Sequence, residues 1–217
     1  VPDFRDVDRY RMTEPETLLR RREKAEAKTT YISDSEITYG VEEYARQFEV
    51  SWQAILNDDL GKIKETPRRM ANAAARWLDE WVSALYDNAT TQATLVALGA
   101  TYAGTGQLTH ANLAVGLNAM MQRTDAGGNQ MNIGKVWLVI PPILRIQANT
   151  IMESVLASGV ATNDKNVLPG FVLGVRVDPY ITTTANSVPW YLFADPGEVP
   201  TLTVARLQGW PGPVVIK

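Results

Sequence analysis

Apolar side chains recur at steps of three and four residues between residues 66 and 88, a period that predicts one long amphipathic helix. Thr66 can cap its first turn, Pro67 suits the position after it, and Asn88 follows the last periodic residue. The apolar stripe of this helix consists of Met70, Ala73, Ala74, Trp77, Trp81, Ala84 and Leu85. We expect the stripe, with its two tryptophans, to be buried in a core.

Shorter elements alternate after residue 89. Thr109 can cap a helix over residues 110–123, and a further helix is predicted over residues 144–158, with Gly159 at its end. Apolar and β-branched runs predict strands at 136–140, 171–177, 190–194 and 201–207. The pattern therefore indicates an α+β chain with a mixed sheet after the long helix.

The beginning of the chain has a different character. Residues 1–30 carry eight Lys or Arg and seven Asp or Glu, and such a segment buries little apolar surface by itself. It is either a solvated helix or tail, or an arm that is ordered against neighbouring copies of the chain through ion pairs. Residues 30–52 favour extended structure because Thr, Tyr and Ile are frequent in them. Val1 is not a start methionine, so we expect a processed or trimmed chain, and no signal-peptide pattern follows it.

The composition narrows the class of protein. With 217 residues, of which 45% are hydrophobic and 21% are charged, the chain can form one large domain or two small ones. A net charge of −3 argues against a generic basic nucleic-acid-binding protein, and no apolar run approaches the length of a membrane span. The absence of cysteine excludes disulfides and thiolate sites, and the single histidine, His110, excludes sites built from several imidazoles.

The sequence predicts no catalytic, cofactor-binding or metal-binding residue. It contains no phosphate-binding glycine fingerprint, no nucleophile elbow and no zinc-protease motif. His110 lies at the start of a predicted helix, where a structural role is favoured over partnering a serine. Asp58 and Asp59 are adjacent, so their side chains diverge, which favours capping over acid–base catalysis. We therefore expect a structural or binding protein without a cofactor.

Several segments follow one another in an order found in one family of viral proteins. They are residues 3–5 (DFR), 51–61 (SWQAILNDDLG) leading into the long helix, 108–113 (LTHANL), 136–142 with Ala148 in the helix that follows, 190–196 (WYLFADP) and 207–209 (LQG). In this order they resemble the major capsid proteins of tailed bacteriophages with the HK97 fold, and are most similar to the Mu-like major head subunits. Trp52 departs from the family pattern, which usually has arginine there.

The resemblance implies an HK97-like α+β fold, with a long spine helix and a mixed sheet in separate parts of the chain. It divides the chain into an N-terminal arm at 1–28, an E-loop at 29–50 that begins at or before residue 29, a P-domain with the spine helix at 51–88, an A-domain with the mixed sheet at 89–185, and a return to the P-domain at 186–217.

The resemblance also implies a function. Copies of the chain would associate as pentamers and hexamers into an icosahedral shell that encloses double-stranded DNA with little sequence-specific contact. Portal, scaffold or protease, and decoration proteins are the further partners of such a shell, and no membrane is involved. The expected location is the capsid of the virion, and the host cytoplasm during assembly. The protein is expected not to be an enzyme.

Two alternatives stay open. The first is an encapsulin-type nanocompartment, since the same fold can build it, and the contents of the particle would separate it from a capsid. The second is a small hydrolase-like enzyme that uses His110, and loss of turnover on changing that residue would reveal it.

We expect contacts between subunits at two charged places. Arg20, Arg21 and Arg22 form the densest basic spot of the charged opening segment. We predict that they lie on the arm or the E-loop and meet acidic side chains of an adjacent subunit, such as those around Glu42 and Glu43. Exposed ion pairs contribute only about 0–1 kcal/mol each, but a shell repeats them in every subunit.

Overall fold

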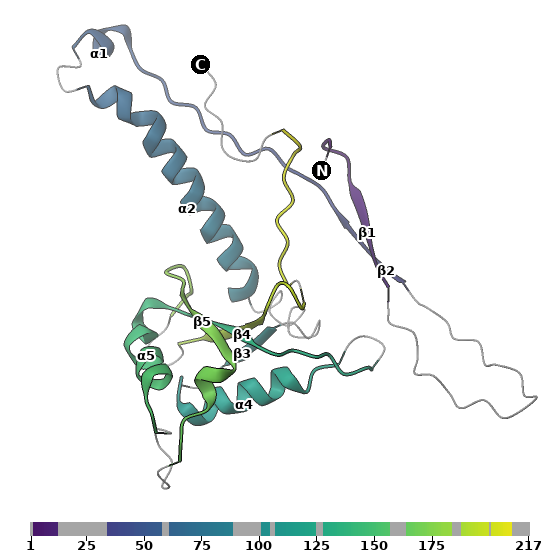
Figure 1. Ribbon diagram of the computed structural model, residues 1–217. Helices are drawn as coiled ribbons and strands as arrows, with labels where there is room; N and C mark the ends of the chain where they lie inside the picture. The colour runs from purple at the N-terminus through teal and green to yellow at the C-terminus, as the bar shows by residue number, and fades with distance from the viewer. Residues whose placement is uncertain are drawn as a thin grey trace, which may run out of the picture. The chain divides into compact units, whose positions relative to one another are not determined.

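A computed structural model of the chain describes residues 2–12, 34–57, 61–88, 101–104, 107–124, 128–156, 164–183, 188–199 and 201–209. Its helices are α1 (Trp52–Leu56), η1 (Lys62–Glu65), α2 (Thr66–Asp87), α4 (His110–Met121), η2 (Pro142–Leu144), α5 (Arg145–Glu153) and η3 (Leu168–Gly170). Its strands are β1 (Val7–Met12), β2 (Asp34–Tyr39), β3 (Thr101–Gly104), β4 (Val136–Ile140), β5 (Val172–Val177) and β6 (Trp190–Ala194) (Figure 1). The predicted α+β class is confirmed.

The chain divides into two compact units, and the boundary falls inside α2, between Trp81 and Val82. Unit 1 consists of the described residues of Val1–Arg11, Asp34–Trp81 and Val204–Lys217. Unit 2 consists of those of Met12–Ser33 and Val82–Thr203. The predicted long helix is confirmed as α2, which ends one residue before Asn88.

In unit 1, β1 and β2 form a two-stranded sheet. The Thr38 hydroxyl donates a hydrogen bond to Asp8 Oδ1 over 2.8 Å, and the Tyr10 hydroxyl donates to Glu36 Oε1 over 3.3 Å. Because moving forward two residues on β1 means moving back two on β2, the strands are antiparallel. The pair joins one strand from the predicted arm with one from the predicted E-loop, and residues 40–51 continue from it as extended chain.

Unit 2 contains a four-stranded sheet in the order β3-β6-β4-β5. β4 runs parallel to β5 and antiparallel to β6, with Val136 opposite Ala194 and Leu138 opposite Leu192. The expected mixed sheet is thereby confirmed. The strand predicted over 201–207 is wrong: these residues belong to neither sheet of the described chain, because their apolar and β-branched pattern met no partner strand.

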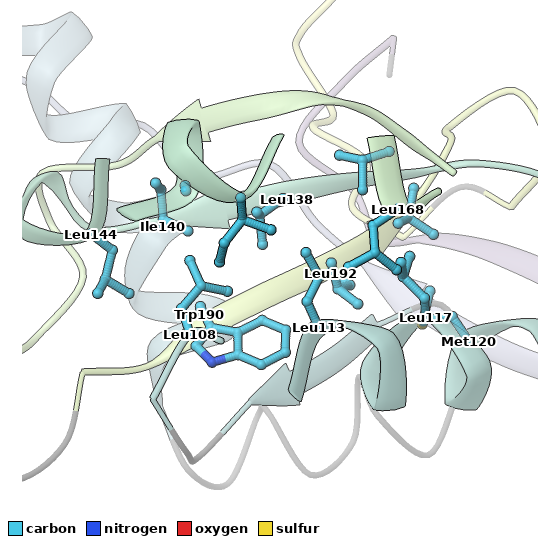
Figure 2. Packing of buried hydrophobic residues seen from close by; sticks show 14 of the residues in the cluster. Leu108, Leu113, Leu117, Met120, Leu138, Ile140, Leu144, Leu168, Trp190 and Leu192 are labelled. Atoms are coloured by element: carbon cyan, nitrogen blue, oxygen red, sulfur yellow. The ribbon is translucent and has the colours of Figure 1, made fainter. Parts of the chain in front are cut away.

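One face of this sheet packs against α4 and α5. Alternate residues of β4 and β6 point to this side, and Figure 2 shows the side chains of α4 directed toward them. The buried cluster includes Leu108, Leu113, Leu117, Met120, Leu138, Ile140, Ala148, Ile151, Trp190 and Leu192. At the start of α4 the predicted cap is present, since the Thr109 hydroxyl accepts a hydrogen bond from the backbone N–H of Asn112 over 3.2 Å.

α5 ends at Glu153, five residues earlier than the sequence predicts. Ser154 is already extended, with φ −67° and ψ 130°. The cause is the buried amide of Asn166, whose Nδ2 donates to the carbonyls of Ile151 and Ser154. These bonds satisfy carbonyls at the end of the helix and so stop it there. Val155, which falls within the predicted helix, lies beyond its end and is exposed.

The opposite face of the sheet packs against the last turns of α2 and the residues that follow β5. Tyr86 meets the ring edges of Tyr191 and Phe193, with centroids 5.1 and 5.3 Å apart, and Val82 and Ile181 pack beside it. The sheet of unit 2 is therefore covered on both faces.

Candidate functional site

Only part of the predicted subunit contact lies within the structure described. Arg20, Arg21 and Arg22 fall outside the described residues. Glu42 and Glu43 are described, and both are exposed on the extended chain after β2. The two carboxylates are therefore accessible to another subunit.

Tyr44 ties this extended chain to α2. Its hydroxyl donates to Glu42 Oε2 over 2.6 Å, and this bond to a carboxylate raises the pKa of Tyr44 because it favours the protonated phenol. Its ring lies 4.4 Å from the ring of Trp77, centroid to centroid, at an angle of 44°. Among the described residues, no backbone hydrogen bond joins 40–50 to another segment, so an aromatic contact holds this stretch.

The apolar stripe of α2 is not buried as predicted. Trp77 is 40% and Trp81 is 45% exposed, and the buried residues of the helix are Ser83 and Tyr86. The expectation of a core position for both tryptophans is wrong. The physical reason is that the sheet of unit 2 covers the side of the last turns of α2 that carries Val82 and Tyr86, which lies opposite to the stripe.

Further large apolar side chains of unit 1 reach the surface. Trp52 on α1 is 72% exposed, and Tyr44 and Phe48 are exposed on the segment before it. We call the following set the unit 1 apolar surface: Tyr44, Phe48, Trp52, Ile55, Leu56, Trp77 and Trp81. Exposed apolar side chains that lie together, as the rings of Tyr44 and Trp77 do, are typical of surfaces that another molecule covers.

A set of polar side chains joins the end of α2 to the sheet of unit 2. Asp178 directly follows β5, and its Oδ2 accepts hydrogen bonds from the hydroxyls of Ser83 and Tyr86. Its Oδ1 accepts the backbone N–H of Tyr180 over 2.9 Å. Burial, followed by the bond to Asp178, raises the pKa of Tyr86 well above its ordinary value.

A second carboxylate, on α2, accepts hydrogen bonds from donors on the sheet side. Asp87, at the end of α2, accepts the backbone N–H of Thr182 and the hydroxyl of Tyr191, each over 2.7 Å. The end of α2 and the sheet of unit 2 thus each supply one carboxylate, and each carboxylate accepts hydrogen bonds from donors on the other element. We call this set the polar junction: Ser83, Tyr86, Asp87, Asp178, Thr182 and Tyr191. Sequence reasoning missed it, and the available signal was that Ser83 and Tyr86 lie three residues apart, off the apolar stripe.

His110 pairs with a buried amide. Its Nε2 lies 3.2 Å from Asn166 Oδ1, which also accepts the backbone N–H of Leu168 over 3.1 Å. Because Nδ2 of the amide faces the carbonyls of Ile151 and Ser154, its oxygen must face the imidazole, so Nε2 carries a hydrogen and donates. The contact ties the first turn of α4 to the end of α5.

The described residues offer little for chemistry on a small molecule. An open hollow of about 400 Å³ lies beside the end of α4, lined by Met121, Gln130, Met131, Asn132, Ile133, Gly134 and Phe171. No group of three or more His, Cys, Asp or Glu that could hold a metal ion occurs in the part of the chain that the structure describes. Within the same part, every helix is too short or too polar to cross a membrane.

Comparison with known proteins gives one match. The model of a family described as phage capsid protein matches residues 34–217, which include α1, α2 and the whole sheet of unit 2. No curated protein and no solved structure matches the chain. Since the family model covers well over half of the sequence, the chain belongs to the phage capsid protein family.

Proposed function

We propose that this capsid protein assembles with copies of itself into an icosahedral shell around double-stranded DNA. As a member of its family it is a structural protein of the virion capsid. The observation that carries the proposal further is the unit 1 apolar surface, because neighbouring copies in a shell would remove these side chains from water. The proposed fold is HK97-like and the proposed subgroup is the Mu-like head subunits.

The proposed parts and partners follow the resemblance. The arm, E-loop, P-domain and A-domain keep the bounds given above, with the E-loop beginning at or before residue 29. Pentamers and hexamers of the chain form the shell. The further partners are a portal protein, a scaffold protein or protease, and decoration proteins. Assembly takes place in the host cytoplasm. We propose no catalytic activity and no cofactor.

The test is direct observation of purified protein. We expect closed particles in negative-stain images, and nucleic acid that resists nuclease inside particles made during phage growth. Light scattering that detects only a 24.0 kDa species at every salt and protein concentration would overturn self-assembly. Particles that hold cargo protein in place of DNA would establish the encapsulin-type alternative.

The proposed contact of Arg20, Arg21 and Arg22 with Glu42 and Glu43 has its own test. Replacing the three arginines by Glu should leave the circular dichroism unchanged and lower the particle yield, most strongly at low salt, where screening is weak. The control is the same measurement at high salt, where parent and variant should converge. Equal yields at low salt would show that these arginines do not take part in assembly.

A further inference from the structure

The charged side chains of α2 are arranged against the helix dipole. Arg68, Arg69 and Arg76 lie toward its N-terminus, whereas Asp79 and Glu80 lie toward its C-terminus, and all five are exposed. The first turn contains no acidic residue and the last turn contains no basic one. Since helices favour acidic residues at the N-terminus and basic ones at the C-terminus, this order does not stabilise the isolated helix.

These charges occupy one side of the helix. Arg69, Asn72, Arg76 and Asp79 recur at steps of three and four residues and therefore share a face, which lies opposite the apolar stripe. Arg68 and Glu80 flank them. We call the charged face of α2 this exposed set: Arg68, Arg69, Asn72, Arg76, Asp79 and Glu80.

We propose that the charged faces of two copies pack against each other with their α2 helices antiparallel, around a twofold axis at the level of Ala74. This inference rests on the proposed function, in that copies must meet in a shell. In this register Arg68 lies opposite Asp79 and Arg69 lies opposite Glu80, and the twofold axis repeats both pairs. A parallel arrangement would instead set arginine against arginine, so the charges specify the orientation of the two helices.

Partners within the subunit do not prevent this contact. Arg69 forms an ion pair with Glu65 over 3.2 Å, and Asp79 also interacts within the chain. A guanidinium has five N–H donors and a carboxylate accepts at two oxygens, so each group can serve a second partner. The pairs are individually weak, and their effect on assembly comes from repetition and from complementary orientation.

Charge reversal on each half of the face tests the pairing. Variant one is Arg68→Glu with Arg69→Glu, and variant two is Asp79→Arg with Glu80→Arg. Each variant alone sets like charges against like, so we expect its particle yield to fall about tenfold or more. Variant one adds acidic residues near the helix N-terminus and should keep the circular dichroism of the parent.

The decisive sample is an equal mixture of the two variants. In the mixture, residues 68, 69, 79 and 80 are all acidic in variant one and all arginine in variant two. Every acidic residue of variant one therefore meets an arginine of variant two across the proposed contact, and the yield should return to within about twofold of the parent value. Ion pairs inside one helix are the same in the mixture as in the separate variants. A mixture that assembles no better than its components would therefore overturn the antiparallel pairing.

Cross-linking supplies a second readout, which does not depend on the charge variants. The chain has no cysteine, so Asn72→Cys introduces a single thiol beside the proposed axis, and Ala74→Cys introduces one at the same level on the opposite side. We expect a short bismaleimide to link two subunits in particles of Asn72→Cys and not in particles of Ala74→Cys. Normal particles without this link would refute the helix pairing alone, whereas absence of particles in the unmodified chain would refute the proposed function.

Discussion

Asn166 is a single buried side chain that holds three elements together. Its amide bonds the carbonyls of Ile151 and Ser154, the backbone N–H of Leu168 and the imidazole of His110. All of its hydrogen-bonding groups face protein, so a substitution leaves several buried polar groups without partners.

We predict that Asn166→Ala lowers the free energy of unfolding by about 2–4 kcal/mol. Urea denaturation of the subunit, followed by circular dichroism, measures the change. The matched control is Asn118→Ala on the exposed side of α4, which should be neutral or slightly stabilising because alanine is the better helix former. Equal effects of the two substitutions would show that the amide of Asn166 contributes nothing.

Tyr86 makes stability depend on alkaline pH. Its pKa is raised in the folded protein, so the phenol keeps its proton where the unfolded chain, with a pKa of about 10, loses it. The unfolded state then binds fewer protons, and the free energy of unfolding falls as the pH rises above about 10, while the contribution stays intact below that value.

We predict that Tyr86→Phe reduces this alkaline loss of stability and costs about 1–2 kcal/mol at neutral pH, where the bond to Asp178 is missing. Urea midpoints measured between neutral pH and about pH 11 provide the test. Ser83→Ala serves as the control: it removes the other hydroxyl that donates to Asp178 but keeps the phenol, so the alkaline loss of stability should remain. A parallel pH profile for parent and Tyr86→Phe would contradict the prediction.

At the scale of elements, α4 lies so close to the sheet that one turn of it has no room for a side chain. A Cβ added to Gly116 would lie 2.9 Å from Tyr102 Cε1 and 3.0 Å from Leu192 Cδ1. Alanine at this position would improve helix propensity by about 1 kcal/mol, but it would also push two packed side chains apart.

We predict that packing outweighs propensity and that Gly116→Ala destabilises unit 2 by about 1–2 kcal/mol. Thermal unfolding monitored by circular dichroism gives the sign. The propensity gain alone is measured by Asn118→Ala in the same helix. Stabilisation by both substitutions would mean that α4 can move away from β3 and β6 without cost.

The elements that the sequence predicted best carry start or stop signals in their own neighbouring residues. The Thr66–Pro67 start of α2, the Thr109 cap of α4 and the apolar run of β4 before Pro141 all depend on neighbouring residues alone. The early end of α5 was missed because it depends on Asn166, which lies 12 residues beyond Ser154. The polar junction was missed for the same reason, since Ser83 and Asp178 are 95 positions apart.

Periodicity also has a limit at this scale. The stripe of α2 shows which side of the helix is apolar, but it does not show what covers that side. In the subunit, Trp77 and Trp81 stay partly exposed. Of the candidate contact residues, sequence reasoning found exposed carboxylates at Glu42 and Glu43, while the partners of an interface lie in another copy of the chain and leave no local pattern.

At the scale of the whole molecule, assembly should be visible in tryptophan fluorescence. We predict that emission shifts to shorter wavelength and that acrylamide quenching falls when particles form, because Trp52, Trp77 and Trp81 leave water. Trp52→Phe should reduce the change. Trp190 is already buried in the subunit, so Trp190→Phe is the control and should preserve the change. An identical spectrum before and after assembly would place the unit 1 apolar surface outside the contacts.

The division of the chain into units has a consequence for the order of events during synthesis. The described elements of unit 2, from the last turns of α2 to β6, lie in the continuous stretch Val82–Thr203. Unit 1 also draws on residues from Val204 onward, which the ribosome makes later. Since domains generally fold as units during translation, unit 2 can close while unit 1 still waits for its last segment. A nascent chain can therefore complete the described elements of unit 2 before those of unit 1.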